Sequence, residues 1–384
     1  MLELPASFLA LGIRTPIGRL RGKLASVGPI DLLATVLRFQ HQSLSPDHPA
    51  IDRVIAANAT NQAGNVARAA ALTAGITPDV LCLTINGQCS GGLTAVRLGT
   101  EAVQSSNAQL VLAAGFECPS LSGDRLEHPL LNTGDQKIRH APDLLGDPAM
   151  GPAADYMAAE LEITRSEQDD YAFQSYRRAS LPRAALLHQA CRLSITLADG
   201  SSMTEDEMAR RRPQRELFSR AKPAFGINGT VTAANCAPLG DGAASIAVGT
   251  EEALSSAGVP AAARIIAATG VGASPAQPAG AVLFAIDKVL STAGMTAEQI
   301  DLWEINEAFA VKVIAAMRRW NLDTSIVNVN GGAISYGHPF GASGIIALIH
   351  ALGELIRSGK SRALVAIAGA GGVAEAVIIE RWAA

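Results

Sequence analysis

Residues 89–93 read Cys-Ser-Gly-Gly-Leu and open a predicted helix, which leads to a buried strand at 111–114 followed by a glycine. Residues 342–346 read Ala-Ser-Gly-Ile-Ile and open a second predicted helix, which leads to a strand at 363–367 and again to a glycine. Two copies of one helix–strand unit indicate a duplicated α/β domain. Strand-type runs also alternate with helical patterns elsewhere, so we expect α/β layers.

The stretch between these two units, residues 119–222, is polar and irregular, with Pro, Asp and Arg scattered among helices. It predicts a large insertion, the usual place for substrate-binding loops. Within it we expect one helix over 163–185, opened by the capping pattern Thr-Arg-Ser-Glu at 164–167. A shorter helix is expected over 297–300. The basic run at 210–215 reads as a solvated surface loop.

Composition narrows the class of protein. The chain has 384 residues, 48% of them hydrophobic, which is enough to bury a large core of two or three packed lobes. A net charge of -4 argues against a nucleic-acid partner, which needs a basic face. The five cysteines form no disulfide framework and show no metal-ligand spacing, so we expect no bound metal.

The location of the protein is also an expectation from sequence. Residues 1–5 lack the basic region and apolar stretch of a secretory signal. Charges or glycines interrupt the apolar runs before they reach membrane-spanning length. We therefore expect a reduced, cytoplasmic protein without a membrane partner.

Cys89 is the first candidate for chemistry, within Ile-Asn-Gly-Gln-Cys-Ser-Gly-Gly at 85–92. Free backbone N–H groups and the helix dipole at a helix start stabilise a thiolate, and glycines let a thioester approach the backbone. A buried structural cysteine is the commoner fate of this residue type. The motif alone leaves both interpretations open.

His338 and Asn306 are the next candidates. His338 stands between a glycine and a proline in the glycine-rich loop 328–344, a poor position for core packing and a good one for acid–base chemistry. Asn306 and Glu307 interrupt an apolar run at 303–310, at the end of a predicted strand. Buried polar side chains need partners, so these two form either a polar network or a site.

Residues 229–235 and 240–244 are turn-rich and flank a candidate ligand loop. Four segments, around Cys89, this loop, Asn306 and His338, resemble the thiolase family, and they occur along the chain in the order found in that family. Further landmarks of that family match residues 14–18, 64–68, 150–151 and 222–225, so the resemblance covers nearly the whole chain.

The resemblance implies a five-layered α-β-α-β-α fold of two similar halves with an inserted loop domain. We place the N-terminal half at 1–118 and 223–250, the insertion at 119–222 and the C-terminal half at 251–384. The family usually forms homodimers or homotetramers. Its substrates are coenzyme A thioesters, and no permanently bound cofactor is implied.

The resemblance also assigns roles to residues. Cys89 matches the nucleophile that takes the acyl group, His338 the base that removes its proton, and Asn306 the side chain that organises the oxyanion hole. This set suits attack of a thiolate on a thioester, where the developing oxyanion needs placed donors. Positions that resemble pantetheine- or acyl-pocket residues are Met150, Phe225, Ala233 and Phe309.

Departures from the family pattern bear on the reaction. Ala368 stands where thiolases carry a second catalytic cysteine, and Ala308 occupies the position used for it in another branch. Ala237 replaces a family serine, Gly91 stands where serine is commoner, and Ala149 where some biosynthetic members have histidine. Alanine cannot move a proton, so the α-carbon step of ordinary Claisen chemistry lacks its usual acid–base group.

Three functions follow from these residues. The first is a thiolase-family acyltransferase that forms acyl-Cys89 and passes the acyl group to an acceptor, impaired in ordinary Claisen chemistry. The second is a decarboxylative, ketoacyl-synthase-like condensing enzyme, since loss of carbon dioxide generates the carbanion without a base. The third is a non-catalytic acyl-CoA-binding subunit, against which the intact Cys-His-Asn set argues.

Overall fold

The computed structural model describes residues 5–45, 51–60, 64–122, 139–209 and 213–382. Its strands are β1 (Phe8–Leu9), β2 (Ile13–Arg14), β3 (Gly18–Arg19), β4 (Arg53–Ala57), β5 (Leu81–Ile85), β6 (Leu110–Glu117), β7 (Ile195–Thr196), β8 (Ser202–Met203), β9 (Gly240–Gly249), β10 (Ala263–Gly272), β11 (Leu302–Ile305), β12 (Arg362–Ala368) and β13 (Val373–Arg381). Its α-helices are α1 (Pro29–Ser43), α2 (Val66–Thr73), α3 (Gly91–Gln104), α4 (Met150–Glu160), α5 (Arg165–Ala179), α6 (Pro182–Ala190), α7 (Arg215–Arg220), α8 (Glu251–Ser256), α9 (Ala281–Ala293), α10 (Ala310–Arg319), α11 (Ala333–Tyr336) and α12 (Phe340–Ser358).

The main sheet repeats one arrangement of strands. Its order is β11-β12-β13-β10-β1-β9-β6-β4-β5, with β2 and β3 also paired to β9. In one half β4 runs parallel to β6, and β9 and β1 follow antiparallel. In the other half β11 runs parallel to β12, and β13 and β10 follow antiparallel. The duplicated α/β domain expected from the sequence is therefore confirmed.

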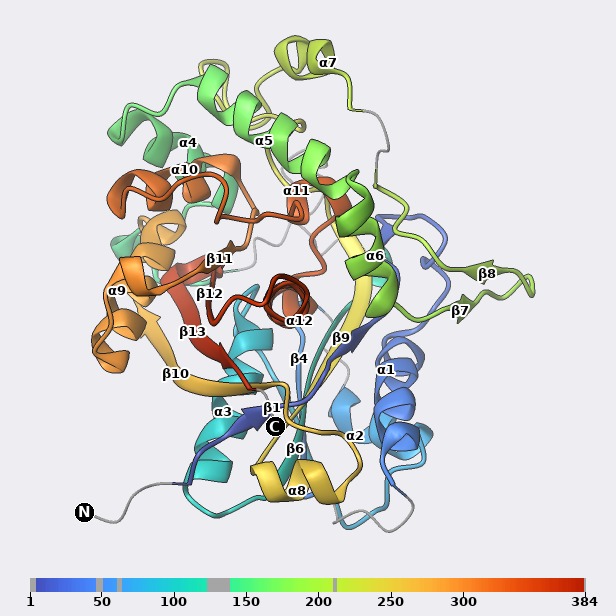
Figure 1. The fold of residues 1–384 in the computed structure, drawn as a ribbon. Helices are drawn as coiled ribbons and strands as arrows, with labels where there is room; N and C mark the ends of the chain where they lie inside the picture. The colour runs from blue at the N-terminus through green and yellow to red at the C-terminus, as the bar shows by residue number, and fades with distance from the viewer. Residues whose placement is uncertain (1–4, 46–50, 61–63, 123–138, 210–212, 383–384) are drawn as a thin grey trace.

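The strands pack in layers because successive side chains point to opposite faces of a sheet. Leu112 on β6 packs in the core beside α1 and α2, whereas Val111 packs in a central core. Leu364 on β12 packs beside α9 and α10, whereas Val365 packs in the same central core. α3 and α12 fill this central core between the two sets of strands (Figure 1). The result is the expected five-layered α-β-α-β-α fold.

α3 and α12 cross so closely that only glycine fits at the contact. A β-carbon added to Gly92 would lie 2.7 Å from the carbonyl oxygen of Gly341. One added to Gly344 would lie 2.9 Å from the backbone nitrogen of Leu93. Gly92 and Gly344, which follow the two predicted helix starts, therefore allow the two helices to pack closely.

α12 is also the one helix in the described part of the chain that is long and apolar enough to cross a membrane. Of its apolar window, 78% is buried inside the protein. The helix is flanked by strands of both halves (Figure 1), so its apolar character reflects its place in the core.

The insertion folds as helices α4 to α7 and the hairpin β7–β8, and α5 runs across one end of the layered core (Figure 1). The expected single helix over 163–185 is wrong, because the chain forms α5 and α6 with a break at Leu181. Leu181 is extended, with ψ of 145°, since the residue before a proline is disfavoured in the helical region. The capping box is confirmed: Thr164 and Glu167 satisfy each other's backbone N–H groups.

The insertion is fastened to the first half by a buried ion pair. The Arg14 guanidinium donates two hydrogen bonds to Asp206, at 2.8 and 2.9 Å, and both residues are buried. Burial, the largest single effect, would raise the pKa of Asp206, but the charge and hydrogen bonds of Arg14, with smaller contributions from His188 and Arg192, together lower this pKa to about 2. Of the basic run, residues 210–212 lie outside the described residues, and Arg215 begins α7 and pairs with Asp170.

Two further sequence expectations need correction. Residues 240–244 are not a turn but the start of β9, a strand in which every residue is buried. Gly240 provides close packing there, since a β-carbon would lie 2.6 Å from Cγ2 of Ile17. The helix expected over 297–300 is a single 3-10 turn, Ala297–Gln299, with a capping box between Thr296 and Gln299.

Candidate active site

A cavity of about 650 Å³ opens beside the starts of α3 and α12. Its walls come from the loops that precede these helices, from the insertion, from the loop before β9 and from the end of β12. Residues on its walls include Cys89, Met150, Phe225, Ala233, Cys236, Ala308, Phe309, His338 and Ala368. The structure therefore gathers residues as far apart in the chain as Arg19 and Ala370 around one space.

Cys89 is held by a tight loop just before α3. Gln88 has a positive φ of 52°, and the Ser90 hydroxyl donates a 2.7 Å hydrogen bond to the Gly87 carbonyl. Gly369 lies against the same loop, where a β-carbon would come within 3.2 Å of the Cys89 nitrogen. Burial raises the pKa of the Cys89 thiol to about 12, although the charge of Lys312 works against this. The backbone hydrogen bond of Cys89 lowers this pKa, in the direction expected for a helix start, but desolvation is the larger effect.

His338 supplies a neutral imidazole to the same cavity. Its side chain is buried, contrary to the expectation of poor core packing, and its Nδ1 shares a 2.6 Å hydrogen bond with the Ser343 hydroxyl. Nε2 is buried with no hydrogen-bond partner among the described residues. Burial, with a smaller contribution from Lys312, lowers the pKa of His338 to about 3. When Nδ1 donates to Ser343, Nε2 is left as the free acceptor that a general base requires.

Asn306 and Glu307, adjacent at the end of β11, have different surroundings. Glu307 accepts hydrogen bonds from the hydroxyls of Tyr171 and Ser175, both at 2.7 Å, and from the Asn328 amide at 3.1 Å. It is therefore the centre of a structural polar network. The Asn306 side-chain nitrogen is buried without a partner among the described residues. This unpaired donor is the chemistry that a developing oxyanion needs, and its role stays a prediction.

The four predicted pocket residues all line the cavity. Met150 begins α4, and the ring of Phe225 lies so close to Gly151 that a β-carbon there would come within 2.3 Å of it. Phe225 and Phe309 pack edge to face with ring centroids 6.1 Å apart. An apolar wall of this kind suits an acyl chain or the pantetheine arm.

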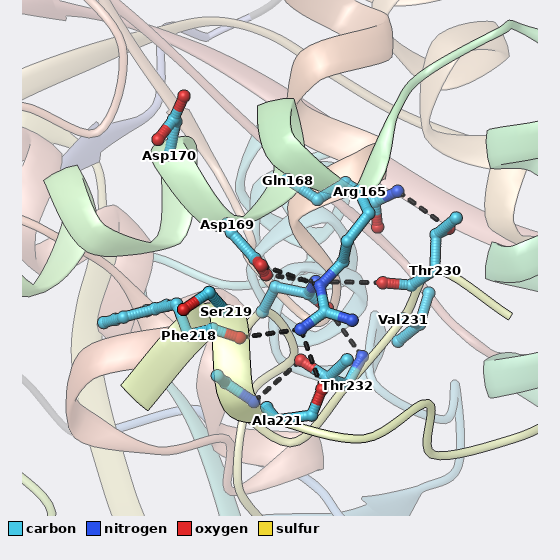
Figure 2. Close-up of polar contacts among 12 residues, drawn as sticks. Arg165, Gln168, Asp169, Asp170, Phe218, Ser219, Ala221, Thr230, Val231 and Thr232 are labelled. Carbon is cyan, nitrogen blue, oxygen red and sulfur yellow. Dashed lines mark hydrogen bonds and ion pairs between the residues drawn. The ribbon is translucent and has the colours of Figure 1, made fainter. Parts of the chain in front are cut away.

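The loop that carries Ala233 is held in place by α5. The Arg165 guanidinium donates to Asp169 at 2.7 Å and to the carbonyls of Phe218 and Ala221 at 2.7 and 2.9 Å, as Figure 2 shows. Asp169 in turn accepts a 2.9 Å hydrogen bond from the Asn235 amide. The insertion thus fixes one wall of the cavity, which agrees with the expectation that it shapes the substrate site.

Two residues near the cavity were missed by sequence reasoning. Cys236 is a second thiol on the cavity wall, and burial raises its pKa to about 12. Lys312 is fully buried on α10, with its Nζ 3.5 Å from the carbonyl oxygen of Ala368. Its position three residues after Phe309, in an otherwise apolar run, was the one available signal.

Ala368 itself ends β12 and lines the cavity with no exposed surface. Ala308 lines the same cavity. Neither methyl group can accept or donate a proton. The thiol of Cys236 lies close to Ala308, because Cys236 pairs with Phe309 and the Ala237 N–H donates to the Ala308 carbonyl at 2.9 Å. The structure therefore places at the cavity both positions where the resemblance predicts a second cysteine, and neither side chain carries an acid–base group.

A duplicated five-layered α/β fold with a thiol- and imidazole-lined cavity defines the class of this protein. The family model for the thiolase N-terminal domain matches residues 8–252, and that for the thiolase C-terminal domain matches residues 259–381. The chain belongs to the thiolase family, and it is an acyltransferase.

Similar proteins agree with this placement over nearly the full chain. A putative acetyl-CoA C-acetyltransferase of Bacillus subtilis is 37% identical, over 96% of this chain and 97% of its own length. An acetyl-CoA acetyltransferase of Escherichia coli is 34% identical, over 96% and 97%. The crystal structure of human mitochondrial 3-ketoacyl-CoA thiolase matches with a TM-score of 0.89 at 30% identity, over 99% of both chains.

Proposed function

We propose that this protein takes an acyl group from a coenzyme A thioester onto Cys89 and passes it to an acceptor. The observation that carries the proposal is one cavity lined by both the Cys89 thiol and the His338 imidazole, whose Nε2 has no other partner among the described residues. A coenzyme A complex of the human mitochondrial 3-ketoacyl-CoA thiolase, 29% identical with a TM-score of 0.89, supports this substrate class.

In the proposed acylation, His338 Nε2 accepts the proton of Cys89 as Sγ attacks the thioester carbonyl. The tetrahedral oxyanion is stabilised through the unpaired amide of Asn306. Collapse breaks the carbon–sulfur bond to coenzyme A, and the His338 imidazolium returns the proton to the leaving thiolate. A base is needed because burial keeps both partners neutral, with the pKa of Cys89 raised to about 12 and that of His338 lowered to about 3.

The second half of the reaction depends on the acceptor. Ordinary Claisen condensation requires a proton to be taken from a weakly acidic α-carbon, and Ala368 offers no group for this. We therefore propose that ordinary Claisen chemistry is impaired relative to acylation. A malonyl-type acceptor, activated by decarboxylation, is the second candidate, and the alanines at both family cysteine positions favour it. The neutral base that lines the same cavity as Cys89 argues against a non-catalytic acyl-CoA-binding subunit.

Intact-mass spectrometry after incubation with a panel of acyl-CoAs, with and without malonyl-CoA, tests the proposal. A single acyl adduct should form, should vanish in Cys89→Ser and should persist in Cys236→Ala, the matched control for the second thiol of the cavity. Acylation that survives in Cys89→Ser, or that disappears only in Cys236→Ala, would show that Cys89 does not carry the acyl group. Turnover of the adduct only with malonyl-CoA would select the decarboxylative acceptor.

The remaining proposals concern assembly and location. We propose a homodimer or homotetramer, supported by Leu81 and Leu83, which are exposed on β5 at the end of the sheet. The gap between the two family matches, 252 to 259, supports a boundary between the halves near residue 250. None of the five cysteines forms a disulfide, which fits a reducing compartment such as the cytoplasm. Light scattering after gel filtration checks the first proposal, and a monomer would refute it.

A further inference from the structure

Lys312 is a buried cation without a matching anion. It lies in the first turn of α10, and no part of its side chain is exposed. Its ammonium makes one hydrogen bond in the described structure, to the carbonyl oxygen of Ala368 at the long distance of 3.5 Å. No ion pair of Lys312 occurs within the residues that the structure describes. Burying an ammonium ion is costly, so a lysine in this position needs a compensating negative charge.

The carboxylates near the site are already satisfied by other groups. Glu117 accepts hydrogen bonds from the backbone N–H groups of Ala59, Thr60 and Gly341, at 3.0 to 3.1 Å. Glu307 is held by Tyr171, Ser175 and Asn328, as described above. These two acids serve the loops around the cavity, and neither is paired with Lys312.

Other titratable groups lie on the elements around α10. They are Asp155 on α4, Asp169 and Tyr171 on α5, Cys236 before β9, Cys89 before α3 and His338 before α12. Asp155 accepts hydrogen bonds from the backbone N–H groups of Thr230 and Val231, and Asp169 is paired with Arg165. The groups whose charge is coupled to that of Lys312 are Cys89 and His338.

Ala368 links Lys312 to these two residues in space. Its carbonyl faces the ammonium, while the residue lines the same cavity as Cys89 and His338. A positive charge beside such a cavity stabilises an anion that forms there during the reaction. It also disfavours a second positive charge, so the His338 imidazole is neutral in the resting state.

We propose that Lys312 is a positioning residue. Its buried ammonium provides a positive charge that stabilises the Cys89 thiolate, both when this thiolate forms and when it is regenerated after acyl transfer. No bond to Lys312 forms or breaks: the proton of Cys89 passes to His338, and Lys312 acts through its charge. The inference deepens the proposed acylation of Cys89 and rests on it. The charge of Lys312 lowers the pKa of Cys89, as stabilisation of the thiolate requires.

The test is the pH dependence of Cys89 alkylation by iodoacetamide, which reports the thiolate and needs no acyl-CoA. Lys312→Met removes the charge at similar side-chain length, and Lys312→Arg retains it. Lys288→Met, which removes a lysine whose Nζ donates to the Gly270 carbonyl at the surface, is the matched control. An opposite charge nearby typically lowers a pKa by about 1 to 3. Because burial lowers the pKa of Lys312 to about 8, its charge is present at pH 7. We expect alkylation of Cys89 at pH 7 to be about ten- to a thousandfold slower in Lys312→Met, with Lys312→Arg and Lys288→Met close to the unmodified protein.

A profile of folded Lys312→Met that superimposes on that of the unmodified protein would overturn the proposal. If Lys312→Met does not fold, Lys312→Gln replaces it, because glutamine removes the charge and keeps a hydrogen-bond donor for the Ala368 carbonyl. An unchanged alkylation rate in that variant would refute the inference, whereas absence of any acyl-Cys89 in the unmodified protein would instead refute the proposed function.

Discussion

Replacing Ala368 by cysteine should restore the α-carbon step of ordinary thiolase chemistry and leave acylation of Cys89 unchanged. Residue 368 ends β12 on the wall of the cavity, so a thiol there would face the same space as Cys89 and His338. A positioned general base is worth roughly a hundred- to ten-thousandfold in rate. That range corresponds to about 3 to 5 kcal/mol of activation free energy. We therefore expect thiolysis of acetoacetyl-CoA by Ala368→Cys to rise by this factor.

The substitution should be tolerated by the fold. The added sulfur atom enters a cavity of about 650 Å³ and not a filled core. Its effect on the free energy of unfolding should therefore be smaller than the cost of about 1–3 kcal/mol for overpacking a well-packed site. Urea unfolding of the two proteins measures this directly, so a change in activity can be separated from a change in stability.

The assay compares three reactions side by side: acyl-Cys89 formation by intact mass, acetoacetyl-CoA thiolysis, and malonyl-dependent condensation. Ala368→Ser is the matched control, because a hydroxyl of similar size is too weak an acid to exchange the α-proton and should give no gain. The reasoning would be refuted if the unmodified protein cleaved acetoacetyl-CoA as fast as Ala368→Cys. Another group would then already supply the base.

Three more measurements follow from the site and the core. His338→Ala and Asn306→Ala should each slow acyl-Cys89 formation by about a hundred- to a thousandfold without unfolding the protein, and a normal rate in either folded variant would remove that residue from the mechanism. Burial lowers the pKa of His188 from 6.5 to about 3, so its contribution to stability is complete above pH 6.5 and is lost as the pH falls below it. At pH 5 this loss is about 2 kcal/mol, and urea unfolding of His188→Leu should lack that part of the pH dependence. Gly344→Ala should destabilise the fold by about 1–3 kcal/mol through the α3–α12 contact, whereas Gly280→Ala, with open space at that position, should change stability little in the same measurement.

The duplicated fold could be predicted because its determinants are local in sequence. Each half repeats a helix start followed by a strand and a glycine, and the two starts bring Gly92 and Gly344 to the crossing of α3 and α12. The walls of the cavity could be predicted from motifs. Met150, Phe225, Ala233 and Phe309 line the cavity, and their contact with an acyl chain or pantetheine arm stays a prediction.

What the sequence could not predict depends on desolvation and on contacts between distant residues. The setting of Cys89 at a helix start favours a thiolate, yet burial raises its pKa to about 12, and burial is a property of the whole fold. Cys236 lies 147 positions after Cys89, and nothing local to either indicates one cavity. The glycine-rich start of β9 resembles a turn, because close packing against Ile17 selects the same small residues as a turn does.

The distribution of charge around the cavity explains why a site made of neutral groups can form anions. The nearby acids Glu117 and Glu307 each accept several hydrogen bonds, and burial raises the pKa of both. The charge of Glu117 still opposes a Cys89 thiolate, because it raises the pKa of that thiol. Lys312, a buried lysine without a carboxylate partner within the described residues, acts in the opposite direction. A positive charge beside the cavity therefore favours anionic states of the reaction over the resting state, which is the condition for rate acceleration.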